Sequence, residues 1–307
     1  MKQQIFIILY CTVMLIVAGT TASRCHAQEP ETAWIEMMPA IPPELTEPSQ
    51  RAEYLVTRFW DKFNFRDTTL LLTHQLLERC FVEYVDLLSL VPEDTRDQSI
   101  QSLLKKSEEV SSMFAHILQL SEKYLYEPAS PLCDEEKLIP FLQYALRSPQ
   151  LDDYQKISLQ YRLDCISINR TGSIANDFTY TLIDGETGRL HAIRADYTLL
   201  YFNDPECDDC QMLIKQLTVS PTINQHILAG LLKIITVYVN DDLDAWKKHA
   251  RDVLSTWIYA YDAEQKIHDE TIYNIKQFPT LYLLDPDKKV ILKDINFETL
   301  EAYFKTP

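Results

Sequence analysis

The sequence predicts an α/β protein in two parts, an all-α domain followed by a domain in which helices flank a mixed sheet. The chain has 307 residues, which is about twice the usual domain length. In the first part apolar residues repeat at helical steps, and no glycine occurs between Gly19 and Gly172. After Gly172, strand-like and helix-like segments alternate, a pattern typical of a sheet covered by helices.

Composition restricts the classes of partner. Apolar residues make up 46% of the chain, enough for packed cores. The 29 basic and 45 acidic residues give a net charge of −16. Binding to phosphate groups needs a basic face, and no cluster of lysines and arginines provides one. The sequence therefore predicts no nucleic-acid partner and argues against an anionic membrane surface as the main partner.

Residues 1–27 have the pattern of an export signal peptide. Lys2 provides a short charged region, residues 5–17 are almost entirely apolar, and Cys25-His26-Ala27 forms a cleavage site before Gln28. The apolar run is shorter than the roughly 20 residues that a membrane-spanning helix needs. We therefore expect an exported, periplasmic protein that is not integral to the membrane unless the signal stays uncleaved. An uncleaved anchor and a lipid on Cys25 are the alternatives for membrane attachment.

The all-α domain is expected over residues 49–169, after a proline-rich linker at 28–48. Four or five helices are expected, in periodic segments that begin at Ser49 and continue over 70–91, 95–125, 134–147 and 152–167. Thr95 and Gln98 form a capping-box pattern, and Pro140 is expected to kink its helix. In the last helix one apolar face is predicted to contain Tyr154, Ile157, Tyr161 and Cys165.

The α/β domain is expected over residues 170–307. The predicted strands cover 178–183, 189–193, 198–202, 231–239, 257–261, 280–284 and 289–293. The predicted helices cover 212–219, 243–253, 264–275 and 297–304. The strand at 198–202 is continuously apolar, which indicates burial on both faces of the sheet.

A Cys-x-x-Cys pair follows this buried strand. Cys207 and Cys210 lie at the start of the next predicted helix, where backbone amides and the helix dipole stabilise a thiolate. Cys207 is expected to attack a substrate disulfide, and Cys210, one turn inside, to resolve the mixed disulfide. A zinc site would need two further ligands, and the other cysteines and the histidines show no paired spacing, so no metal is expected. A purely structural disulfide is the alternative that stays open.

Two segments carry a resemblance to a known family. Residues 199–210 (LLYFNDPECDDC) and 275–287 (IKQFPTLYLLDPD) resemble the two signatures of thioredoxin-like proteins of the TlpA/ResA type. The resemblance implies a thioredoxin-like fold over roughly 170–307 with no cofactor. It also implies that Pro279 is a cis proline against the cysteine pair, and that substrate binds along Phe278, Pro279 and Thr280. The helical part resembles exported proteins of uncharacterised function, which implies no activity for it.

The surroundings of the pair depart from the family pattern. Tyr201 stands where many thioredoxins have a buried acid. Four carboxylates, those of Asp204, Glu206, Asp208 and Asp209, crowd the pair. Negative charges disfavour a nearby thiolate, so the pair is expected to act as a reductant or to stay oxidised and inert.

The function predicted from the sequence is an exported thiol–disulfide oxidoreductase that works in the reducing direction. Its partners would be a protein disulfide or thiol substrate and an electron-donor protein. The alternative is a redox-silent thioredoxin-like scaffold, or binding module, with a structural Cys207–Cys210 disulfide. A bridge between Cys133 and Cys165 also stays open, because sequence alone does not determine pairing.

Overall fold

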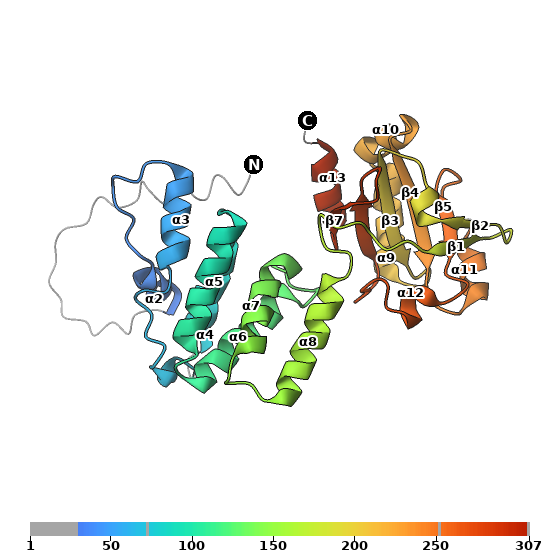
Figure 1. Cartoon of the computed structure of the whole chain (residues 1–307). Coiled ribbons are helices and arrows are strands. Elements are labelled where there is room, and N and C mark those ends of the chain that lie inside the picture. Colours follow the sequence, from blue (N-terminus) through green and yellow to red (C-terminus); the bar gives the residue numbers. More distant parts are fainter. Residues whose placement is uncertain (1–29, 72–73, 251–252, 306–307) are drawn as a thin grey trace.

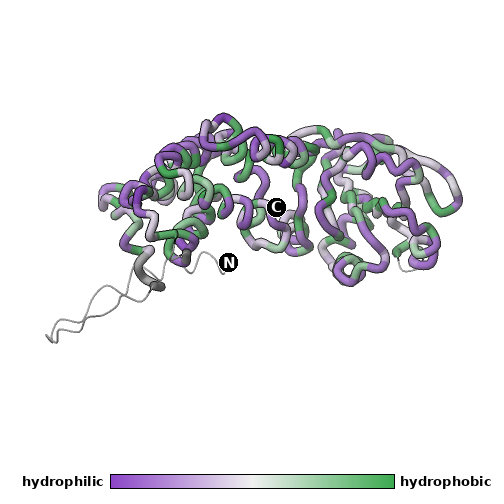
Figure 2. Tube along the Cα trace, turned by 90° about the horizontal axis from the view of Figure 1, so that it is seen from below, coloured by the Kyte–Doolittle hydropathy of each residue, from purple (hydrophilic) through white to green (hydrophobic). Residues whose placement is uncertain are grey.

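The computed structural model describes residues 30–71, 74–250 and 253–305, so the predicted signal peptide lies outside the described residues. Figure 1 shows a helical part, formed by α2 to α8, beside a part built on a sheet. Hydrophobic stretches occur in both parts (Figure 2), and each part buries a core of its own. The predicted fold class, helices first and a mixed sheet second, is confirmed.

The helical part follows the predicted periodic segments in most places. Its elements are α2 (Pro30–Met37), α3 (Pro48–Arg58), a 3₁₀ turn η1 (Thr68–Leu71), α4 (His74–Leu88), α5 (Glu93–Ser107), α6 (Ser111–Leu125), α7 (Glu135–Arg147) and α8 (Asp153–Ser167). Pro140 lies inside α7, as expected. The helix α2 falls in the segment expected to be a linker. Its Trp34 and Met37 pack against the helical core, so this stretch differs from an extended linker.

The prediction of a single helix over 95–125 is wrong, because the helix is interrupted between α5 and α6. Val110 adopts an extended conformation there (φ −131°, ψ 110°). Tertiary contacts hold the break: Tyr144 and Ser148 donate hydrogen bonds to the Glu108 carboxylate. The expected capping box is also absent from the start of α5, which begins at Glu93 with Pro92 at the N-cap. Contacts with α7 and the segment after it thus outweigh the local helical pattern.

The apolar face predicted for α8 is wrong in part. Cys165 is buried, but Tyr154, Ile157 and Tyr161 are 86%, 68% and 69% exposed. The residues of α8 that reach the interior are Leu159, Cys165 and Ile166. The helix therefore presents three of the four predicted residues to solvent instead of to the core.

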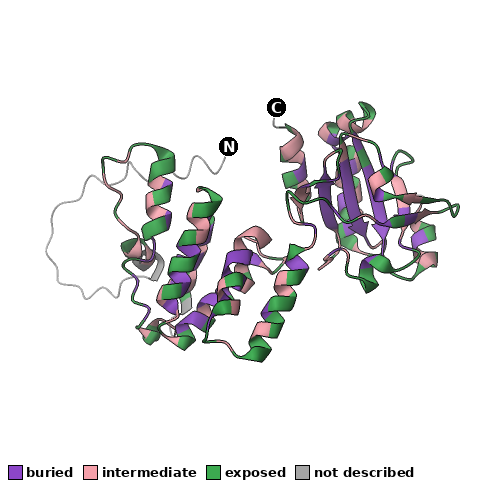
Figure 3. Ribbon diagram, viewed as in Figure 1, coloured by how far each residue is buried: buried purple, intermediate pink, exposed green. Residues whose placement is uncertain are grey.

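The sheet has seven strands in the described residues, in the order β2-β1-β5-β4-β3-β6-β7. The strands are β1 (Thr179–Leu182), β2 (Thr187–Arg189), β3 (Tyr197–Asn203), β4 (Leu232–Tyr238), β5 (Ile258–Tyr261), β6 (Thr280–Leu284) and β7 (Val290–Lys293). β3 pairs parallel with β4 and antiparallel with β6. Leu199 and Leu200 belong to separate cores on the two faces, and Figure 3 shows the central strands as buried. This arrangement fixes the carboxyl end of β3, where the cysteine pair begins.

The helices around the sheet are α9 (Asp208–Val219), α10 (Pro221–Leu228), α11 (Leu243–His249), α12 (Lys266–Asp269) and α13 (Phe297–Lys305), with a 3₁₀ turn η2 (Leu190–Ala192). The helix α10 was not among the predicted elements. A helix was expected over 264–275, but α12 is one turn long and Thr271 follows it with a φ of 48°. Residues 270–279 therefore form an irregular loop that leads into β6.

Across 30–71, 74–250 and 253–305, no helix combines the length and apolar character that crossing a bilayer requires. The same stretches contain no cluster of three or more histidine, cysteine, aspartate or glutamate side chains arranged to hold a metal ion.

Candidate functional site

The cysteine pair lies at the junction between β3 and α9. Cys207 is the N-cap residue of α9, and its sulfur accepts a hydrogen bond from the backbone N–H of Cys210 at 3.5 Å. Cys207 is half-buried, whereas Cys210 is fully buried, and both are free cysteines. One sulfur thus reaches the surface and the other lies directly behind it, an order suited to attack followed by resolution.

The loop before β6 faces the half-buried Cys207 sulfur. The Cys207 thiol donates a hydrogen bond to the Phe278 carbonyl at 3.6 Å, and the Phe278–Pro279 peptide bond is cis. Phe278 packs against the cores on both faces of the sheet. Thr280 is buried, and its hydroxyl donates to the Gln277 carbonyl at 2.7 Å. Phe278 and Pro279 therefore lie beside Cys207, while the Thr280 side chain braces the loop from inside.

This geometry is matched by known proteins. Residues 195–290 match the family described as thioredoxin-like. A crystal structure of a thioredoxin-like protein from Bacteroides caccae is 38% identical to this chain, with a TM-score of 0.85, and the match covers 87% of this chain and 97% of that one. The chain belongs to the thioredoxin-like family. The family resemblance expected from the two signatures is thus confirmed.

Two further comparisons concern parts of this thioredoxin-like protein. Residues 19–169 match a domain of unknown function, DUF5106. The C-terminal domain of an uncharacterized protein from Bacteroides fragilis is 42% identical over 45% of this chain and 98% of that domain, with a TM-score of 0.44. No curated protein matches the chain.

Behind the pair, the thioredoxin-like domain provides a hydroxyl instead of a carboxylate. The buried Tyr201 hydroxyl donates to the Cys210 carbonyl at 3.0 Å. Burial raises the pKa of Tyr201 well above its usual value, so its hydroxyl stays protonated. Burial also raises the pKa of the Cys210 thiol to about 12. Tyr201 therefore anchors the start of α9, and the Cys210 thiol is protonated at neutral pH.

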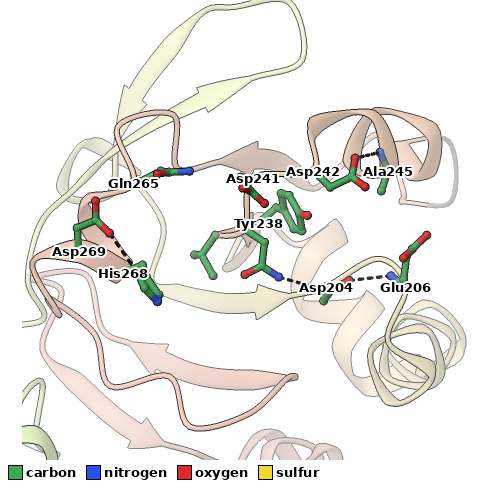
Figure 4. Close-up of a pocket in the computed structure, with 11 residues that line it drawn as sticks. Asp204, Glu206, Tyr238, Asp241, Asp242, Ala245, Gln265, His268 and Asp269 are labelled. Atoms are coloured by element: carbon green, nitrogen blue, oxygen red, sulfur yellow. Dashed lines mark hydrogen bonds and ion pairs between the residues drawn. The ribbon is translucent and has the colours of Figure 1, made fainter.

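An acidic pocket opens at Asp204 and Glu206, which precede Cys207 in the chain (Figure 4). It has a volume of about 510 Å³ and is lined by several acidic side chains. Asp204 is fixed there, since it accepts hydrogen bonds from the Glu206 backbone at 2.9 Å and from the Asn240 side chain at 2.8 Å. The described lining residues include Asp241, Asp242 and Asp269 but no lysine or arginine. The pocket is therefore strongly negative.

Neutralising the two acids between the cysteines is expected to make Cys207 more reactive. Asp208 and Asp209 are exposed, so their charges act on the sulfur through a screened medium. We expect an Asp208→Asn/Asp209→Asn variant to be alkylated at Cys207 about two- to fivefold faster at pH 7 and low salt. Iodoacetamide kinetics measure this, and the gain should shrink in 1 M salt as screening becomes strong (~3 Å Debye length). An unchanged rate at low salt would show that these carboxylates do not control the thiol.

The structure adds residues that sequence reasoning missed. Asn240 orients Asp204, and Lys276 anchors the loop that carries Phe278. Their partners are distant in the sequence, so no local motif marked them. The neighbouring acids were visible in the sequence, but their shared pocket with β4 and α12 was not.

Proposed function

We propose that this protein is an exported thiol–disulfide oxidoreductase that reduces protein disulfides through Cys207 and Cys210. The observation that carries the proposal is the contact between the half-buried Cys207 sulfur and the Phe278 carbonyl, with Cys210 buried behind it. Membership of the thioredoxin-like family supports the same chemistry. Export rests on the signal-like pattern of residues 1–27.

The reaction proceeds in two exchanges. The Cys207 thiolate attacks one sulfur of the substrate disulfide, the substrate S–S bond breaks, and the leaving sulfur takes up a proton. Cys210 then loses its proton and attacks the Cys207 sulfur, which releases the second substrate thiol. The substrate gains two electrons, and the protein is left with a Cys207–Cys210 disulfide. An electron-donor protein, itself a dithiol, returns the pair to the reduced form.

The charges around the pair support the reducing direction. A stabilised thiolate makes a disulfide easy to reduce, and therefore oxidising. Here Asp204, Glu206, Asp208 and Asp209 oppose the stabilisation that the amino end of α9 offers. The closed disulfide is consequently favoured over the open dithiol, which gives the dithiol a strong tendency to donate electrons.

Acid-quenched alkylation of the native full chain tests the proposal. Cys207 and Cys210 are expected to be open after treatment with a mild dithiol reductant, to close on addition of a protein disulfide, and to transfer two electrons per chain. Mass analysis of the labelled peptides counts the thiols. A pair that closes and then opens only in denaturant would identify a redox-silent scaffold instead and overturn the proposal.

A further inference from the structure

A buried ion-pair cluster joins the helical part to the loop of the candidate site. Glu135, in the first turn of α7, lies 2.9 Å from the Lys276 ammonium and 2.8 Å from the Lys293 ammonium. The side chains of Glu135, Lys276 and Lys293 are 8%, 11% and 6% exposed. Such charges are costly to bury unless they are paired, so each charge of the cluster depends on its partners for its buried position.

Lys276 is held from several sides by the helical part. Its ammonium donates to the Tyr126 carbonyl at 3.4 Å and lies 4.7 Å from the centre of the Tyr126 ring. Asp294, which follows β7 in the sheet part, lies 3.9 Å from the same ammonium. Burial disfavours the charged form of Lys276, but Glu135 outweighs it, and the pKa of Lys276 is raised. The lysine therefore stays charged and bound to Glu135.

Lys293 binds the same glutamate from β7, the strand beside β6, into which the loop leads. It lies at the end of β7, opposite Tyr282 of β6. Its ammonium donates to the carbonyls of Ile166 and Ile168, at the carboxyl end of α8, at 3.1 and 2.9 Å. Cations are favoured at a helix carboxyl end. Glu135 thus pairs with Lys276, which precedes Pro279 in the loop, and with Lys293 on β7, which pairs with β6.

The position of Lys276 links this cluster to the chemistry. Lys276 is two residues before Phe278, whose carbonyl contacts the Cys207 sulfur, and residues 270–279 have no regular secondary structure. Each residue of such a loop loses conformational entropy when it is fixed in one conformation. An anchor close to Phe278 orders the loop before substrate arrives, so that substrate binding costs less conformational entropy.

We propose that Glu135 of the helical part is a positioning residue for the thioredoxin-like site. It holds the substrate-binding loop in place through Lys276. The inference rests on the proposed function, because it assigns the loop to binding of the protein substrate. The proposal gives the helical part a role in the reaction. The helical part keeps the Phe278 backbone in the conformation that binds the substrate strand carrying the disulfide.

A Glu135→Gln variant of the full chain tests this, with Glu136→Gln as the matched control. Glu136 is the next residue of α7 and pairs with Arg170 instead of with the loop. In Glu135→Gln we expect about tenfold faster amide exchange in residues 276–281 and about a fivefold higher KM for a protein disulfide. The rate with a small disulfide, which does not lie along the loop, should stay within about twofold. The control should match the wild-type protein in all three measurements.

A second variant separates positioning from simple loss of stability. Glu135→Gln/Lys276→Gln also removes the Lys276 charge that Glu135→Gln alone leaves without its partner, so the fold should recover part of its stability. Lys293 keeps its hydrogen bonds to the carbonyls of Ile166 and Ile168 in this variant. The loop stays unanchored, so its fast exchange and the raised KM should persist. Full recovery of both in the double variant, or no change in a folded Glu135→Gln variant, would overturn the proposal. Amide exchange needs no turnover, so it decides the positioning role even if the wild-type protein reduces no disulfide and the proposed function fails.

Discussion

A Cys207→Ala variant is expected to lose disulfide-reductase activity by at least about a thousandfold, because the attacking sulfur is the nucleophile of the first exchange. The side chain is half-buried at the N-cap of α9, so the fold should survive the change. Reduction of insulin with dithiothreitol as electron source measures the activity. A folded variant that keeps more than a tenth of wild-type activity would contradict the mechanism.

Two other cysteine variants define the roles more closely. Cys210→Ser keeps the attacking sulfur but removes the resolving one, so it should accumulate a mixed disulfide between Cys207 and the substrate. Cys133→Ser is the matched control, because Cys133 is a free cysteine of the helical part, whose thiol donates to the Leu125 carbonyl. It should keep wild-type activity within about twofold. Loss of activity in this control would point to a second redox centre.

An Asp294→Asn variant is expected to gain stability at pH 7.5 relative to the wild-type protein. Burial, followed by the charge of Glu135, raises the pKa of Asp294 from 3.8 to about 6. The folded protein therefore binds the proton more tightly than the unfolded chain. This contribution to stability is complete below pH 3.8 and is lost as the pH rises through 6. Two pKa units correspond to about 3 kcal/mol, and the loss is only a part of this because Asp294 borders solvent, which screens its charge. Asparagine, which is always neutral, avoids the loss.

Urea unfolding at pH 4 and pH 7.5 measures this difference. Asparagine also tolerates the positive φ of 53° at position 294, so the substitution brings no backbone strain. Asp287→Asn, at an exposed residue of the turn between β6 and β7, serves as the control and should show no pH-dependent gain. Equal effects of Asp294→Asn at the two pH values would contradict the raised pKa.

The sequence predicted the fold class where local and global signals agree. The apolar run of β3, the cysteines after it and the two family signatures led to the correct order of strand, helix and loop. The family is confirmed. The roles assigned to Cys207, Cys210, Phe278, Pro279 and Thr280 stay predictions, although the first three are in contact or adjacent in the structure.

The features that the sequence did not reveal depend on contacts between distant residues. The break at Val110 is held by Tyr144 and Ser148, which no pattern around residue 110 contains. The stripe on α8 has helical spacing, but spacing does not say which face meets the core. The pairing of Glu135 with Lys276 joins the two parts of the chain, and lysine and glutamate are common at surfaces, so neither residue stood out.

Equilibrium titration of the full chain against dithiothreitol buffers tests the central claim, that Cys207 and Cys210 form a reducing pair. The oxidised fraction, read by acid-quenched alkylation, gives the midpoint potential. We expect a cooperative two-electron transition below about −200 mV. A midpoint near about −120 mV, typical of a strong oxidant, or a pair that never opens in the folded protein, would contradict it.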